Sequence, residues 1–125
     1  MSDSCLIAIV DDDSSLLRAL ARLFRGRGYE VETYTSARHF LATLDERQPD
    51  CLLVDFRMPE MSGVDLLRAL RERGARLPAI LMTAFVQDNL SRQIAGKNVV
   101  AVLYKPLQEE PLFEAIGAAT RPAGD

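Results

Sequence analysis

Residues 51–55, Cys-Leu-Leu-Val-Asp, decide how the rest of the chain is interpreted. Their aliphatic run is typical of a strand that is buried on both faces, as in a parallel sheet. The run leads directly into a carboxylate, and Pro59 and Gly63 then turn the chain. In open α/β sheets, functional groups lie at the carboxyl ends of the strands. Asp55 is therefore the first candidate for a functional residue.

Other apolar runs flank this strand, and segments with helical spacing of apolar residues separate them. We expect strands at residues 6–10, 29–34, 51–55, 79–83 and 99–104. We expect helices between Ser14 and Gly26, between Ser36 and Pro49, between Val64 and Gly74, over residues 85–95, and from Glu109 onward. This alternation predicts an α/β domain, doubly wound around a five-stranded parallel sheet with right-handed crossovers. The helix at residues 85–95 has the thinnest apolar stripe, so we expect it to be the most loosely held element.

The chain has 125 residues and a net charge of −3, with 48% hydrophobic and 26% charged residues. These values predict one folded domain rather than a disordered chain. The acidic balance, without a basic stripe, argues against direct binding of nucleic acid. No apolar run reaches the roughly 18 residues of a membrane span, and the N-terminus lacks a secretory signal. We therefore expect a cytoplasmic protein in which Cys5 and Cys51 are reduced.

Polar residues follow four of the expected strands at the point where each strand ends. They are Asp11, Asp12, Asp55, Thr83 and Lys105. If the first strand lies beside the third, and the fourth beside the fifth, these residues converge on a single pocket.

Such a pocket favours phosphoryl chemistry. Three carboxylates repel one another, so at least one of their pKa values should be raised. A hard divalent cation with oxygen ligands relieves this repulsion, and Mg²⁺ is the usual choice beside phosphate. A carboxylate beside Mg²⁺ can attack a phosphoryl group, while Lys105 supplies positive charge and Thr83 a hydroxyl donor. The spacing predicts that Asp55 accepts a phosphoryl group as an acyl phosphate.

The sequence resembles the receiver domain of two-component response regulators from Leu6 to about Ala119. Four motifs carry the resemblance, one at the end of each of four strands. They are Asp11-Asp12, Asp55 with Met58-Pro59 and Gly63, Thr83-Ala84, and Lys105-Pro106. The resemblance implies the flavodoxin-like or CheY-like fold, with the strand order 2-1-3-4-5.

The resemblance also assigns roles to the residues of the pocket. It implies that Asp55 is the phosphoacceptor and that Thr83 and Lys105 bind the phosphoryl group. It further implies a Mg²⁺ (or Mn²⁺) site at Asp55 that Asp12 contacts directly. Asp11 would act largely through water. The backbone carbonyl of Arg57 would complete the protein ligands.

The resemblance implies a regulatory domain rather than an enzyme, although the domain would take part in its own phosphorylation and dephosphorylation. A sensor histidine kinase or phosphotransfer protein would be the phosphodonor. A downstream effector or output domain would recognise the face formed by the fourth helix, the fifth strand and the fifth helix. A phosphorylation-dependent homodimer is a further expectation, and no membrane partner is expected. Residues 1–120 would form the receiver and residues 121–125 a tail or the start of a linker, in a stand-alone protein or a longer regulator.

The chain departs from the family pattern at the position three residues before Lys105. Receivers usually carry Tyr or Phe there, and the ring swings inward when the Thr moves toward the phosphate. This chain has Val102, and Tyr104 lies two residues later on the same side of the strand. Arg57 and Phe85 occupy two positions that tune dephosphorylation in the family. Whether Tyr104 replaces the missing ring stays open at this point.

Two alternatives remain on sequence grounds. Asp11-x-Asp13-x-Ser15 mimics the nucleophile motif of haloacid dehalogenase-type phosphatases. That reading leaves Asp55 and the Asp11-Asp12 pair unexplained. The second alternative is a receiver-like binding module that signals without phosphorylation, and the missing ring at Val102 favours it. Such modules have generally lost one of the acids, the Thr or the Lys, all of which this chain keeps.

Overall fold

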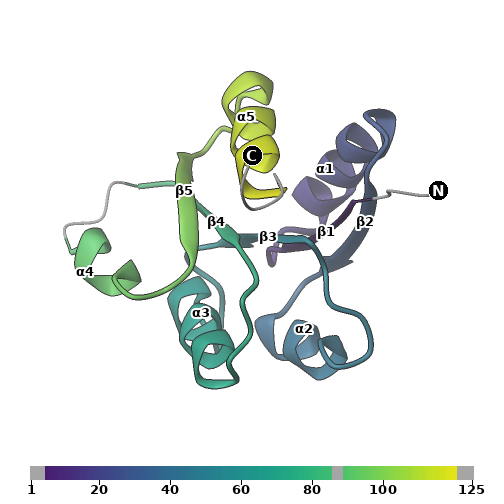
Figure 1. Ribbon diagram of the computed structural model, residues 1–125. Coiled ribbons are helices and arrows are strands. Elements are labelled where there is room, and N and C mark those ends of the chain that lie inside the picture. The colour runs from purple at the N-terminus through teal and green to yellow at the C-terminus, as the bar shows by residue number, and fades with distance from the viewer. Residues whose placement is uncertain (1–4, 86–88, 121–125) are drawn as a thin grey trace.

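In the computed structural model, which describes residues 5–85 and 89–120, one parallel sheet lies between two layers of helices (Figure 1). The strands are β1 (Leu6–Val10), β2 (Glu30–Tyr34), β3 (Cys51–Asp55), β4 (Ala79–Thr83) and β5 (Val99–Tyr104). The helices are α1 (Ser14–Gly26), α2 (Ala37–Thr43), α3 (Gly63–Glu72), α4 (Leu90–Ile94) and α5 (Glu109–Thr120). The strand order is β2-β1-β3-β4-β5, which confirms the predicted order and the doubly wound α/β fold.

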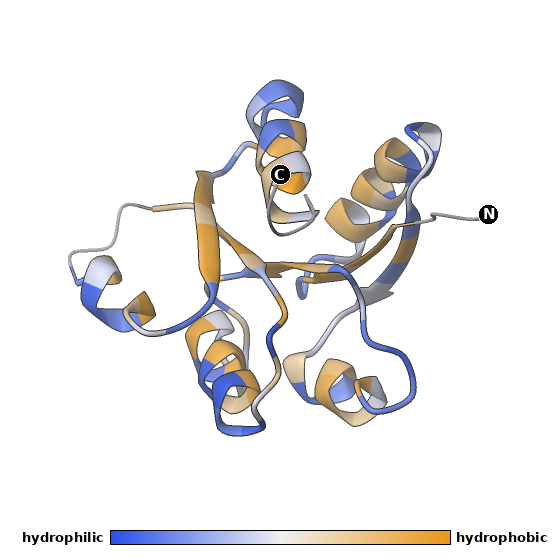
Figure 2. Ribbon diagram, viewed as in Figure 1, coloured by the Kyte–Doolittle hydropathy of each residue, from blue (hydrophilic) through white to orange (hydrophobic). Residues whose placement is uncertain are grey.

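The core lies on both faces of the three central strands, β1, β3 and β4, which are buried along their whole length. Because side chains alternate along a strand, each central strand contributes apolar side chains to the core on both faces of the sheet. In β3, Leu52 and Val54 pack toward α2 and α3, while Cys51 and Leu53 pack toward α1 and α5. Figure 2 shows the central strands and β5 as mostly apolar, and the helices as apolar on the side facing the sheet. Within residues 5–85 and 89–120, no helix has the length and apolar character needed to cross a membrane.

The helix starts follow from local capping. The side chain of Asp13 accepts hydrogen bonds from the backbone N–H groups of Ser15 and Leu16, so Asp13 caps α1. Ser36 caps α2, as predicted. Ser62 and Asp65 form a capping box at α3, where each side chain accepts from the other residue's backbone N–H. Capping of α3 fixes the exit from the loop that follows Asp55.

Three predicted boundaries were wrong. The expected helix at residues 85–95 is only Leu90–Ile94: Phe85 lies before it, and residues 86–88 fall outside the described chain. Only Leu90 of α4 is buried, and Asn89 makes no side-chain capping bond, so little holds a longer helix. Strand β2 begins at Glu30, because Tyr29 instead packs its ring against Phe24 and Phe113. Helix α2 ends at Thr43, well before Pro49.

Candidate functional site

The five polar residues singled out above lie at the carboxyl edge of the sheet. Asp11 and Asp12 follow β1, Asp55 and Thr83 are the last residues of β3 and β4, and Lys105 follows β5. Strand β3 pairs with both β1 and β4, with Val10 beside Val54 and Asp55 beside Met82. The strand order therefore brings these side chains to one edge, as the sequence predicts.

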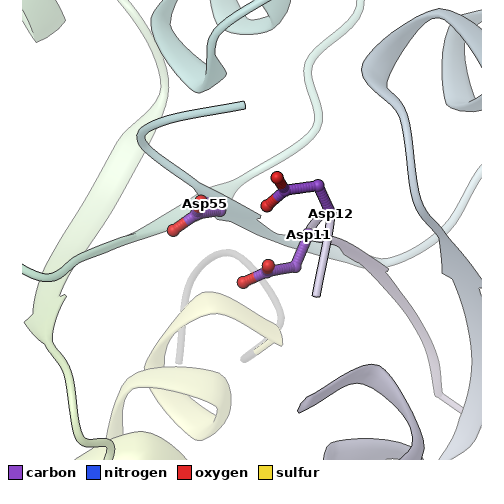
Figure 3. A group of neighbouring side chains, drawn as sticks. All are labelled: Asp11, Asp12 and Asp55. Atoms are coloured by element: carbon purple, nitrogen blue, oxygen red, sulfur yellow. The ribbon is translucent and has the colours of Figure 1, made fainter. Parts of the chain in front are cut away.

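The three aspartates form a tight cluster (Figure 3). One carboxylate oxygen of each lies within 4.8 Å of those of the other two. Asp11 is fully buried and Asp55 is 7% exposed, whereas Asp12 is exposed. Carboxylate oxygens converging from two strands are the ligands that Mg²⁺ prefers. The donor set therefore fits a hard divalent cation, with Asp12 on the solvent side.

Lys105 forms ion pairs with two of these carboxylates. Its Nζ lies 2.9 Å from Asp11 Oδ2 and 2.9 Å from Asp55 Oδ1. The expectation from sequence was a pocket governed by repulsion among carboxylates. In the structure, the ammonium group offsets much of that repulsion, because it pairs with the two buried members of the cluster.

The pKa values of the pair reflect this geometry. Burial raises the pKa of the Asp55 carboxyl, Asp11 adds to the effect, and the hydrogen bond from Lys105 opposes it. Burial alone would lower the pKa of the Lys105 ammonium, but its hydrogen bonds to Asp55 and Asp11 outweigh burial and raise it. The predicted raised carboxyl pKa is thus confirmed at Asp55, with desolvation rather than charge repulsion as its largest cause.

Backbone groups fix the orientation of Asp11. The N–H of Asp13 donates to Asp11 Oδ1 at 2.9 Å, while Lys105 occupies Oδ2. The N–H of Asp11 donates to the carbonyl of Tyr34 on β2. Both carboxylate oxygens are therefore held in place. The side chain of Asp13 caps α1, so Asp13 is not a member of the aspartate cluster.

The hydroxyl of Thr83 is bonded to the loop after β4. Its Oγ1 donates to the carbonyl oxygen of Phe85 at 2.9 Å and accepts from the Phe85 N–H at 3.3 Å. Thr83 is 2% exposed and lies on the same edge as Asp55. The structure thus links the hydroxyl of Thr83 directly to the chain that leads to α4.

Gly63 has a role in the site that sequence reasoning did not identify beyond the turn. Its N–H donates to the carbonyl of Phe56 at 3.0 Å, which closes the loop after Asp55. A Cβ at this position would collide with the backbone carbonyl of Asp55. Gly63 therefore lets the start of α3 pack directly against the end of β3.

The two switch candidates on β5 differ in exposure. Val102 pairs with Leu81 and packs, half-buried, against the apolar core that includes Leu90 of α4. Tyr104 pairs with Thr83 and is 49% exposed. Because side chains alternate along β5, Tyr104 lies on the same side of the sheet as Val102. The roles of both residues, and of the exposed Arg57 and Phe85, stay predictions.

Comparisons with known proteins agree with this geometry. A family model described as the response regulator receiver domain matches residues 7–117. The response regulator protein TodT of Pseudomonas putida is 39% identical over 122 residues, which cover 97% of this chain and 54% of that protein. The transcriptional regulatory protein FixJ of Rhizobium meliloti is 32% identical over 114 residues, which cover 91% of this chain and 56% of that protein. The chain spans about half the length of these relatives.

Solved structures give the same result. The crystal structure of FixJ-N superposes with a TM-score of 0.85 at 32% identity, and the match covers 96% of this chain and 95% of that one. A CheY-like receiver domain from Methanospirillum hungatei superposes with a TM-score of 0.85 at 28% identity, with 94% of each chain covered. The aspartate cluster, the lysine and the strand order therefore have a common explanation. This chain belongs to the family of response regulator receiver domains of two-component systems.

Proposed function

We propose that Asp55 is the phosphoacceptor of this receiver domain. The observation that carries the proposal is the pairing of Asp55 with Lys105, at 2.9 Å, within a cluster of three carboxylates at the carboxyl edge of the sheet. Asp55 is the only member of the cluster that comes from β3, the central strand, and it accepts a hydrogen bond from Lys105. No backbone N–H of the residues that the structure describes donates to its carboxylate. One of its oxygens is thus available for attack on phosphorus.

The transfer follows from these positions. A carboxylate oxygen of Asp55 attacks the phosphorus of the donor, and the donor's leaving group departs with the electron pair of the broken bond. The product is an acyl phosphate. In this mixed anhydride the attacking oxygen bridges the Asp55 carboxyl carbon and phosphorus, and Lys105 then donates to a phosphoryl oxygen. Thr83 exchanges its hydrogen bond with Phe85 for one to the phosphoryl group, which couples phosphorylation to the loop before α4.

The proposed metal site uses the same carboxylates. Asp12 and Asp55 would contact Mg²⁺ (or Mn²⁺), the backbone carbonyl of Arg57 would complete the protein ligands, and Asp11 would act largely through water. When bound, the ion supplies positive charge that neutralises the phosphoryl oxygens. The arrangement of Asp11 supports this division, because both of its oxygens already have partners, whereas Asp12 is exposed.

The assignment of Asp55 has a direct test. With Mg²⁺ and acetyl phosphate, the wild-type protein should gain one acid-labile phosphoryl group, measured by intact-protein mass spectrometry. Asp55→Asn should gain none, because the amide is not a nucleophile. Asp45→Asn, at an exposed acid outside the cluster, serves as the matched control and should be labelled like wild type. Equal labelling of wild type and Asp55→Asn would rule out Asp55 as the acceptor.

Mg²⁺ should stabilise the fold through the aspartate cluster. At about ten times Kd, the linkage contribution is roughly 1.4 kcal/mol. For a domain of this size it raises Tm by about 3–6 °C. Asp12→Ala should remove this response, and the control Asp13→Ala, which removes only a helix cap, should keep it. Differential scanning fluorimetry with and without Mg²⁺ measures the Tm shift of the wild type and of each variant. A shift that survives Asp12→Ala would show that the ion binds elsewhere.

The signal would leave the domain through the face formed by α4, β5 and α5. A sensor histidine kinase or phosphotransfer protein is the proposed phosphodonor, and an effector, an output domain or a second receiver is the proposed reader. Support comes from the hydrogen bonds between Thr83 and Phe85, because the chain continues from there toward α4. Helix α4 has one buried residue, Leu90, and no side-chain cap, so little energy opposes its displacement.

Phosphorylation is therefore expected to act on α4 rather than on a rotating ring. Valine has one stiff torsion and no ring, so the usual switch cannot operate at Val102. Amide hydrogen exchange, with and without a beryllofluoride mimic of the phosphoryl group, should change most over residues 84–98. The change should persist in Tyr104→Ala. If that substitution erases it, Tyr104 is the switch; if wild type shows no change there, the domain binds phosphate without relaying the signal to α4.

A binding module that signals without phosphorylation is the second candidate, and Val102 is the observation that favours it. The labelling experiment separates the two candidates, because such a module would not be stably modified on Asp55. The phosphatase alternative requires Asp13 to act in catalysis, and Asp13 instead caps α1.

A further inference from the structure

The second half of α3 and the turn after it carry four arginines, and two of them differ from the others. Arg68 pairs with Asp65 at 3.0 Å, and Arg73 donates to the carbonyl of Leu41 at 3.2 Å. Arg71 and Arg76 have no carboxylate partner among the residues that the structure describes. Two positive charges on this part of the surface are therefore not neutralised by any carboxylate in residues 5–85 or 89–120.

These two arginines line the same cavity, which has a volume of about 300 Å³. Its apolar floor consists of Leu67, Leu70 and Leu77, each only 3% exposed. Beyond the floor, its lining includes Arg71, Gly74, Ala75, Arg76, Gly96 and Asn98. The cavity thus combines an apolar surface with two guanidinium groups and one side-chain amide.

Arg71 lies against the loop between α4 and β5. A Cβ on Gly96 would be 3.0 Å from Arg71 Nη1, and Gly96 has a φ of +77°. The absence of a side chain at Gly96 therefore leaves room for the guanidinium group at the rim of the cavity. One wall comes from α3 and the other from the α4–β5 loop, so a bound molecule would touch both.

The cavity is separate from the phosphorylation site. Leu77 and Asn98 precede β4 and β5, so the cavity lies at the amino edge of the sheet. Asp55, Thr83 and Lys105 lie at the carboxyl edge. The strands of the sheet separate the two sites.

We propose that this cavity binds a small organic anion, a carboxylate or a phosphate ester carried on an apolar body. Guanidinium groups bind both anions through paired, charge-assisted hydrogen bonds. The leucine floor would cover the apolar part of the ligand. A volume near the lower limit of small-molecule sites, about 300 Å³, favours a ligand of up to about three rings over a larger one. Asn98 would add a hydrogen bond that helps to orient the anion.

The probe for this site is 8-anilinonaphthalene-1-sulfonate, an anion on an aromatic body. Its uncharged relative, N-phenyl-1-naphthylamine, is the matched ligand. Fluorescence titration without Mg²⁺ should give saturable binding of the anion. Arg71→Ala and Arg76→Ala should each weaken it about tenfold, since a charge-assisted hydrogen bond contributes roughly that factor. Both should leave binding of the uncharged relative unchanged, and Arg71→Lys should keep part of the affinity.

Arg68→Ala is the matched protein control, because it removes an arginine of α3 that does not line the cavity. It should bind the anion like wild type. Shifts of the Gly96 and Asn98 amide resonances, measured by nuclear magnetic resonance, should locate the probe, and thermal melting confirms that each variant is folded. Absence of saturable binding, equal affinity for the charged and uncharged probes, or equal affinity in wild type and both alanine variants would each overturn the proposal.

Discussion

Replacing Lys105 with methionine should lower the melting temperature by about 10 °C in the absence of Mg²⁺. The substitution keeps most of the side-chain volume but leaves Asp11 and Asp55 buried without their shared counter-charge. Removing one partner of a buried ion pair costs about 3–5 kcal/mol. The Lys105 side chain is 24% exposed and Asp55 can take up a proton, so about 2–3 kcal/mol is expected here. For a domain of this length, that free energy corresponds to roughly 10 °C.

The chain contains one other lysine, which provides the control. Lys97 makes no ion pair with the residues that the structure describes, so Lys97→Met should melt within about 1–2 °C of wild type. Mg²⁺ should restore part of the stability of Lys105→Met, because a cation at the aspartate cluster replaces some of the lost charge. If Lys105→Met melted like wild type without Mg²⁺, the ion pairs would not contribute to folding.

The positions of the site residues could be predicted because they depend on short-range patterns. Aliphatic runs define β3, β4 and β5, and the residue that ends or follows each run can be read directly from the sequence. The contacts of Lys105 could not be predicted in the same way. Strand β4 lies between β3 and β5, so Lys105 and Asp55 meet across the end of β4 and not between neighbouring strands. A sequence records the length of that side chain but not the direction in which it lies.

In the fold, too, features set by local sequence signals could be predicted, and features set by tertiary packing could not. Helices α1 and α3 have wide apolar stripes and side-chain caps, and both begin where local signals predict. Helix α4 has neither, and the prediction for residues 85–95 was too long. Its extent depends on what the sheet offers it to pack against, which is tertiary information. The apolar pattern alone could not predict the strand order either. That prediction came from the resemblance to receiver domains.

Replacing Gly63 with alanine should be the most damaging single-methyl change near the site. The added Cβ would meet the carbonyl of Asp55, which is backbone and cannot rotate away. Relief requires α3 to move from β3, yet the capping box of Ser62 and Asp65 and the hydrogen bond from Gly63 to Phe56 hold α3 in place. The expected loss in the free energy of unfolding is about 3 kcal/mol, at the upper end for overpacking.

Gly117→Ala is the matched control, because Gly117 lies inside α5 and a Cβ there would meet nothing within 4 Å. It should gain about 0.5–1 kcal/mol, since alanine is the better helix former. Urea unfolding of the two variants beside wild type measures both changes. Because the strain in Gly63→Ala acts on Asp55 itself, that variant should also lose much of the Mg²⁺-dependent rise in Tm. Gly63→Ala with wild-type stability would show that α3 can shift away from β3 at little cost in free energy. The close packing at Gly63 would then not be needed to position the aspartate cluster.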